Sequence, residues 1–465
     1  MEHEDFLDEE MRAVVAKYEQ MLDNDHKVYF DTNEYEDIID YYLSSNKLKK
    51  ALDAIQIART QHPYTIEFLL RKAHVLAIMG DLNSALEIVD EAETIEPSNT
   101  ELLIAKGDIL DQLERFDEAI AYFERALEAG EEKADILLNI AYVFQNVGSF
   151  EKALHYLELL LEEEPHNEQV LYEIAYCYDI TGKNAESIDF YTRFIETQPY
   201  SFAAWYNLGV VYHKTENFEK AVWAYDYAIL INDNFGSAFF NKGNSLSELE
   251  RFEEALESYK KTLEIEGADA MIFCSMANCY EKLDMMQSAR SFYKKAIKLN
   301  PELADAWFGI GVTFDAEEKY HDAIVYFKKA INLEEDEADF WFALADTYFK
   351  AGLHDKADEA YGKTCGKDVK YWEAWLDWSV LQLKINNIER AKEIIEECIF
   401  FNENQHQPHY RLAAYEYLYG DKQNAYDSFA NALRLNFDDN FLFFDLVPEA
   451  ASDFDIVNLL DTYLP

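Results

Sequence analysis

The stretch FAAWYNLGVVYHKTENFEKAVWAYDYAILINDN, residues 202–234, contains the pattern on which the rest of this chain is built. Trp205 and Tyr212 lie seven residues apart, as do Ala221 and Ala228, and seven residues make two turns of a helix. Each half of the stretch therefore predicts a helix with one packing face, on which large and small residues alternate so that two antiparallel helices interlock. Because one such pair cannot bury its own apolar face, further copies of it are expected along the chain.

The pattern recurs every 34 residues from Thr32 onward without a gap. The twelve predicted repeats start at Thr32, Ile66, Thr100, Ala134, Glu168, Phe202, Gly236, Ala270, Ala304, Ala338, Trp372 and His406. The twentieth position of each repeat is small and reads Ala51, Ala85, Ala119, Ala153, Ser187, Ala221, Ala255, Ala289, Ala323, Ala357, Ala391 and Ala425. The eighth position is also small from the second repeat onward, and only Ile39 in the first repeat departs from this rule.

Proline and glycine recur at fixed positions of the same 34-residue repeat. The thirty-second position, where the second helix must stop, is proline in Pro63, Pro97, Pro165, Pro199 and Pro301. The fifteenth position, between the two helices, suits a left-handed backbone and holds Gly80, Gly148, Gly182, Gly352, Gly420, Asn46 and Asn386. Every repeat is therefore expected to be helix, tight turn, helix.

These positions resemble the tetratricopeptide repeat family over residues 32–439. The resemblance implies an all-α fold, a right-handed superhelical α-solenoid whose first helices line a concave groove and whose second helices form the convex back. Residues 1–31 are predicted to hold an N-terminal capping helix. Residues 440–465 are predicted to be a C-terminal capping segment of two short helices separated near Pro448, or alternatively a docking peptide.

Composition narrows the classes of partner. The formal net charge is -50, which repels phosphate backbones and anionic membrane surfaces, so we expect neither nucleic acid nor a membrane as partner. Hydrophobic residues make up 49% of the chain and aromatic residues 15%, which is ample material for a packed core. The five cysteines have no disulfide spacing, and no apolar run is long enough to span a membrane. We therefore expect a cytoplasmic protein with reduced thiols.

No motif of catalytic or cofactor chemistry stands out. Gly362, Lys363 and Thr364 resemble the end of a phosphate-binding loop, but they lie inside a predicted second helix with no strand before them. Cys274 and Cys279 are five residues apart, a spacing that does not place two zinc ligands on one helical face. We expect no catalytic residue, no metal, no cofactor and no enzyme activity.

The candidate site is the groove. On each first helix the second, fifth, sixth, ninth, twelfth and thirteenth positions lie opposite the packing seam. In the middle repeats these positions predict a peptide-binding set, Asn139, Tyr142, Tyr172, Tyr176, Tyr206, Asn207, Phe240, Asn241, Asn244 and Asn278. The asparagines resemble the ladder with which some family members hold the backbone of an extended peptide. The alternative is that they face water or a neighbouring helix.

The C-terminal half of the groove is predicted to be acidic and aromatic. Its groove positions include Phe308, Val312, Phe342 and Phe349, with aspartates beside them. This combination suits a basic amphipathic segment, whereas the alternative is that the aromatic rings pack against neighbouring repeats. The family's carboxylate clamp is not expected, because the second position carries no basic residue in any repeat.

These features favour a non-enzymatic scaffold or adaptor that binds an extended or helical, neutral-to-basic protein segment. A structural protein that self-associates is the first alternative. A chaperone-like or regulatory subunit of a larger complex is the second.

Overall fold

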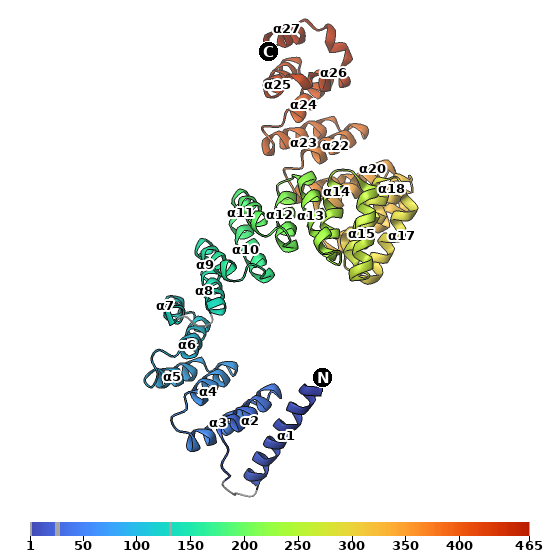
Figure 1. The fold of residues 1–465 in the computed structure, drawn as a ribbon. Coiled ribbons are helices and arrows are strands. Elements are labelled where there is room, and N and C mark those ends of the chain that lie inside the picture. The colour runs from blue at the N-terminus through green and yellow to red at the C-terminus, as the bar shows by residue number, and fades with distance from the viewer. Residues whose placement is uncertain (1, 24–27, 130–132, 465) are drawn as a thin grey trace. The chain divides into compact units, whose positions relative to one another are not determined.

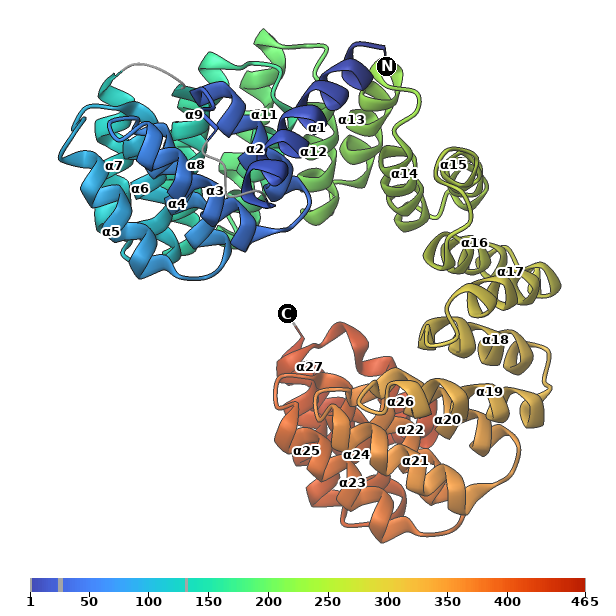
Figure 2. The same ribbon diagram turned by 90° about the horizontal axis from the view of Figure 1, so that it is seen from below.

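The computed structural model describes residues 2–23, 28–129 and 133–464, which form α-helices and short 3-10 helices without a strand. Their contacts divide the chain into two units, Met1–Thr215 and Glu216–Pro465, and the division falls in the turn of the sixth repeat. Within each unit, consecutive helices lie side by side (Figure 1, Figure 2).

The first unit opens with α1 (Glu2–Asp23), which packs against the first helix pair. Its first helices are α2 (Thr32–Ser44), α4 (Glu67–Ile78), α6 (Thr100–Gln112), α8 (Lys133–Asn146), α10 (Glu168–Thr181) and α12 (Phe202–Lys214). Its second helices are α3 (Leu48–Gln61), α5 (Leu82–Glu93), α7 (Phe116–Ala129), α9 (Phe150–Glu163) and α11 (Asn184–Thr197).

The second unit begins with the second helix of the sixth repeat, α13 (Phe218–Ile231). Its first helices are α14 (Gly236–Glu248), α16 (Ala270–Lys282), α18 (Ala304–Ala316), α20 (Ala338–Lys350), α22 (Trp372–Lys384) and α24 (His406–Tyr419). Its other second helices are α15 (Phe252–Glu266), α17 (Met286–Leu299), α19 (Tyr320–Leu333), α21 (His354–Lys367), α23 (Ile388–Phe401) and α25 (Lys422–Leu435).

The helix pairs follow the predicted register. Ten of the twelve described first helices begin at the predicted repeat start, and the other two begin one residue away from it. Every alanine at the twentieth position is fully buried, and Ser187 is 1% exposed. The all-α solenoid predicted from the sequence is therefore confirmed for the described residues.

Glycine at the eighth position makes room for an aromatic ring of the second helix in the same repeat. A Cβ atom on Gly243 would lie 2.6 Å from the ring of Tyr259, and one on Gly311 would lie 2.6 Å from the ring of Phe327. These distances are far below van der Waals contact, so any larger side chain would force the two helices apart. Close packing in these two repeats thus depends on this pairing of glycine with a ring.

The turn between the two helices uses one backbone conformation almost throughout. Six of the seven predicted glycines and asparagines at the fifteenth position have positive φ. The prediction is wrong for Gly420, whose φ is -127°. There the carboxylate of Glu416 accepts a hydrogen bond from the backbone N–H of Asp421 at 3.2 Å, so the side chain closes this helix end. Acidic residues take the left-handed conformation in five other repeats: Glu114, Glu216, Glu250, Asp284 and Glu318.

After α25 the chain continues through the 3-10 helix Asp438–Asn440, α26 (Phe441–Leu446), the 3-10 helix Pro448–Ser452 and α27 (Phe454–Tyr463). The helix α26 packs on α24, and α27 packs on α25. Phe443, Val447, Ala450 and Ile456 are fully buried in the cluster that results. The segment predicted as a cap therefore packs these four apolar residues against the last repeat.

Candidate functional site

Tyrosines form the most exposed part of the predicted site in the first unit. Tyr172 and Tyr176 on α10 are 39% and 49% exposed. Tyr142 on α8 and Tyr206 on α12 are half-buried. Tyr142 donates a hydrogen bond to Glu173 at 3.4 Å, and partial burial raises the pKa of both Tyr142 and Tyr172. Rings that keep one accessible face can pack against the side chains of a bound segment.

The asparagines of this unit are already hydrogen-bonded within the protein. The amide of Asn139 donates to the carboxylate of Asp108 at 3.3 Å. Asn207 is only 4% exposed, and its amide donates to the backbone carbonyl of Leu171 at 3.3 Å. The hydroxyl of Tyr191 donates to the same carbonyl at 2.9 Å. The structure therefore places Asn207 between α10 and α12 and corrects the expectation that it presents an open amide to a peptide backbone.

A cavity of about 200 Å³ lies between α10, α11 and α12, and Tyr176 is part of its lining. Asn207 and Ser187 line it, and the Ser187 hydroxyl is buried without a hydrogen-bond partner among the described residues. Two predicted site residues, Tyr176 and Asn207, thus share one small cavity.

In the second unit, two predicted residues on α14 serve packing. Phe240 contacts the ring of Tyr259 with the two centroids 5.7 Å apart. Asn244 accepts a hydrogen bond from the hydroxyl of Tyr259 at 2.8 Å. Asn241 is half-buried on the same helix, whereas Asn278 on α16 is exposed. Of the predicted asparagines, Asn278 therefore has the most accessible amide.

Asn278 lines a cavity of about 420 Å³ between α16 and α18. All six positions that the sequence predicts to face the groove in this repeat lie in its wall: Met271, Cys274, Ser275, Asn278, Glu281 and Lys282. The next repeat contributes four of its own groove positions, Asp305, Phe308, Gly309 and Val312. The predicted facing of the first helices and the observed cavity therefore agree in these two repeats.

The remaining wall of this cavity comes from Tyr293 on α17. Its hydroxyl donates to the carboxylate of Glu281 at 2.9 Å. The ring reaches that position because residue 309 is glycine, since a Cβ atom there would lie 2.1 Å from Cζ of Tyr293. Burial raises the pKa of Glu281 and raises that of the Cys274 thiol to about 12, so this thiol stays protonated and unreactive near neutral pH.

The aromatic residues of the C-terminal half are mostly used in packing between repeats. Phe308 stacks on Phe340 with centroids 4.7 Å apart, and Phe342 contacts Tyr371 at 5.1 Å. Phe349 is half-buried against the same core. The intramolecular alternative is therefore correct for Phe342 and Phe349, while Phe308 both stacks within the core and lines the cavity.

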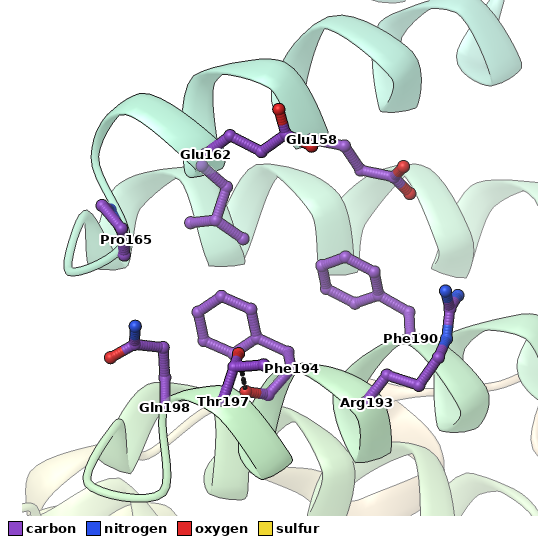
Figure 3. Close-up of a pocket in the computed structure, with 9 residues that line it drawn as sticks. Glu158, Glu162, Pro165, Phe190, Arg193, Phe194, Thr197 and Gln198 are labelled. Carbon is purple, nitrogen blue, oxygen red and sulfur yellow. Dashed lines mark hydrogen bonds between the residues drawn. The ribbon is translucent and has the colours of Figure 1, made fainter.

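A cavity of about 340 Å³ that the sequence analysis does not predict lies between the second helices α9 and α11. Phe190 and Phe194 stand four residues apart on α11, with ring centroids 6.1 Å apart. Figure 3 shows the two rings pointing from α11 toward α9, from which Glu158 and Glu162 project. Two aromatic residues at this spacing on a second helix are a signal that could have indicated the cavity.

Neither a metal site nor a membrane span is found in the described part of the chain. No group of three or more histidine, cysteine, aspartate or glutamate side chains there could hold a metal ion. No described helix is both long enough and apolar enough to cross a bilayer.

Comparison with protein-family models finds three that match, and each is described as a tetratricopeptide repeat. Together they match residues 110–175, 168–200, 190–222, 236–269, 272–303 and 316–364. These segments lie in both units and include nearly all of the first repeat that lines the cavity of 420 Å³, whereas residues 304–315 of the next repeat lie outside them. A comparison with curated proteins gives no match.

Several solved structures are similar to this chain at low identity. The APC/C hetero-tetramer Cut9-Hcn1 is 14% identical, with 89% of this chain and 94% of that chain covered and a TM-score of 0.44. The C-terminal part of a repeat protein from Cytophaga hutchinsonii is 16% identical, with 55% and 99% covered and a TM-score of 0.41. MamA is 23% identical, with 35% and 95% covered and a TM-score of 0.32. TM-scores this low do not support transfer of any partner to this chain.

Proposed function

Because this chain belongs to the tetratricopeptide repeat family, we propose that it is a non-enzymatic scaffold that binds an extended or helical segment of another protein. The segment would bind to the first-helix surface, meaning the surface formed by the groove positions of the first helices. The cavity between α16 and α18 is the observation that supports this proposal best.

The size and lining of the cavity fit a protein side chain. A volume of about 420 Å³ exceeds that of any single amino-acid side chain, and the wall mixes apolar groups with amide, hydroxyl and carboxylate groups. Binding sites are commonly concave, with apolar walls and a few polar groups that fix orientation. The proposed segment is neutral or basic, because Glu281 and Asp305 in the wall would repel a carboxylate.

The proposal can be tested by selecting displayed random peptides on the immobilised protein. A groove variant, Met271→Ala with Asn278→Ala and Asp305→Ala, removes three exposed side chains from the cavity wall. We expect the selected peptides to lose most of their affinity for this variant, because the side chains that would contact them are gone. The variant should still fold, because the buried residues between its helices are unchanged.

A matched control changes three exposed residues outside the cavity in the same part of the chain, Lys294→Ala with Lys298→Ala and Glu302→Ala. Peptides should bind this control as they bind the unmodified protein. Peptides that bind the groove variant and the control equally well would place recognition elsewhere and contradict the proposal.

Self-association is a second candidate, because apolar side chains are exposed at the C-terminal end. Phe454 is 76% exposed, Phe441 is 51% exposed and Leu464 is 66% exposed. Exposed apolar groups close together can mark a protein interface. Light scattering over a concentration series tests this candidate, since a constant monomer mass at all concentrations would exclude it.

A further inference from the structure

The cavity between α16 and α18 contains two carboxylates that form no ion pair with a described lysine or arginine. Glu281 and Asp305 both line it, and neither forms an ion pair with a lysine or arginine among the described residues. Two other acidic residues at groove positions in this unit, Asp315 and Asp346, do form such an ion pair. Asp315, on the same helix as Asp305, pairs with Lys350 at 2.8 Å.

Glu281 is held in a fixed position on the cavity wall. The hydroxyl of Tyr293 donates to one of its oxygens, Oε2, at 2.9 Å, which leaves Oε1 as an acceptor. Lys282 also lines the cavity and favours the charged form of Glu281, but its ammonium group is not within ion-pair distance of that carboxylate. The wall thus presents a positioned acceptor, Oε1 of Glu281, that is not paired with a cation at ion-pair distance.

The apolar part of the wall is fixed as well. The ring of Phe308 is stacked on Phe340 with centroids 4.7 Å apart, so its orientation is set by the core. Val312 and Met271 complete the apolar surface. Aromatic faces attract cations, and arginine is the cation that most often stacks on them.

We propose that this cavity binds an arginine side chain of the protein segment recognised by the first-helix surface. The inference rests on the proposed function and adds the chemistry of one anchoring residue. The planar guanidinium group carries five N–H donors, enough to reach Glu281 and Asp305 together while its face lies on Phe308. Lysine fits less well, because its ammonium group is compact and strongly hydrated, and a carboxylate would be repelled.

The direct test uses two blocked probes, N-acetyl-arginine methylamide and N-acetyl-citrulline methylamide; citrulline has nearly the same shape, but a neutral carbonyl oxygen replaces one NH2 group of the guanidinium. The reporter is the ¹³C-labelled methyl group of Met271, which is 51% exposed and lines the cavity. We expect the arginine probe to shift this signal with at least tenfold greater affinity than the citrulline probe.

The variant Glu281→Gln keeps the shape of the side chain and removes its charge. We expect it to weaken the arginine probe at least tenfold and to leave the citrulline probe unchanged. Asp305→Asn is a second variant, at an exposed position where folding is not at risk, and it should weaken the arginine probe in the same direction. Glu302→Gln, an exposed acidic residue outside the cavity, is the matched control and should have no effect.

The outcomes separate this inference from the proposed function. One outcome is that selected peptides need the cavity and yet bind equally well when their arginine is replaced by citrulline in a synthetic copy. That result would overturn the arginine inference and leave the proposed function intact. Arginine-probe binding that depends on Glu281, with no displayed peptide retained by the protein, would support the cavity chemistry and contradict the proposed function. Equal binding of the arginine probe to the unmodified protein and to both carboxylate variants would overturn the inference.

Discussion

Replacing the acidic residues of two interhelical turns by glycine should stabilise the second unit. Glu250 and Glu318 have φ values of 57° and 58°, a conformation in which a Cβ atom crowds the following carbonyl oxygen. Both residues are exposed, and neither forms an ion pair among the described contacts. The double variant Glu250→Gly with Glu318→Gly therefore changes the backbone preference of the turn and removes two negative charges.

The expected gain follows from two opposing terms. The left-handed conformation costs a residue with a Cβ atom about 1–2 kcal/mol, whereas glycine costs roughly 0.5–1 kcal/mol in additional chain entropy on folding. Each glycine should therefore gain about 0.5–1 kcal/mol relative to alanine at the same position. The two turns lie two repeats apart, so the effects should add to about 1–2 kcal/mol.

Alanine at both positions is the matched control, because it removes the same charges and keeps the Cβ atom. The urea midpoint, followed by tryptophan fluorescence and fitted with a nearest-neighbour model for repeats, measures the difference between the glycine and alanine pairs. The reverse change, Gly352→Ala, should destabilise by about 0.5–1 kcal/mol, since φ there is 74° and the new Cβ atom meets nothing within 4 Å. A glycine pair no more stable than the alanine pair would refute the reasoning.

Three other changes test single contacts. Gly309→Ala should destabilise by about 1–3 kcal/mol in urea denaturation, because the added Cβ atom would lie 2.1 Å from the Tyr293 ring. Burial raises the pKa of Asp108 to about 6, because the folded state favours the neutral carboxylic acid. The stability that this preference adds is fully present below about pH 4 and is lost as the pH rises from about 4 to 6. Asp108→Asn should therefore stabilise by about 2 kcal/mol at pH 7 and by almost nothing at pH 4, as thermal melts at both pH values would show. Tyr191→Phe removes the donor to the Leu171 carbonyl and should cost about 1 kcal/mol in urea denaturation, and an unchanged midpoint would contradict this.

The helix pairs could be predicted from the sequence because their packing repeats in a fixed register. Small residues such as Ala221 and Ala255 recur at one position, and the structure buries them completely. The left-handed turn could be predicted only where glycine or asparagine marks it. Glu250 and Glu318 take the same conformation because the spacing of the two packed helices imposes it, against the preference of the residue itself.

Less of the site than of the fold could be predicted from the sequence. The facing of a first helix follows from its periodicity, which is why the groove positions around Asn278 do line a cavity. Whether an amide is accessible depends on neighbours from other helices. Asn207 bonds to the carbonyl of Leu171, and Asn244 bonds to the hydroxyl of Tyr259, and neither contact has a signature in the spacing of residues.

The glycine–ring pairs have a consequence for how such an array can change in length. Gly243 and Tyr259 belong to one repeat, so a duplication of residues 236–269 would copy both partners of this contact, and a deletion would remove both. Tyr293 and Gly309 belong to successive repeats, and an insertion between them would separate a ring from the only residue type that admits it. A contact of the first kind stays whole whenever its repeat is copied or lost, whereas the contact of Tyr293 with Gly309 is kept only if the two repeats around the cavity remain adjacent.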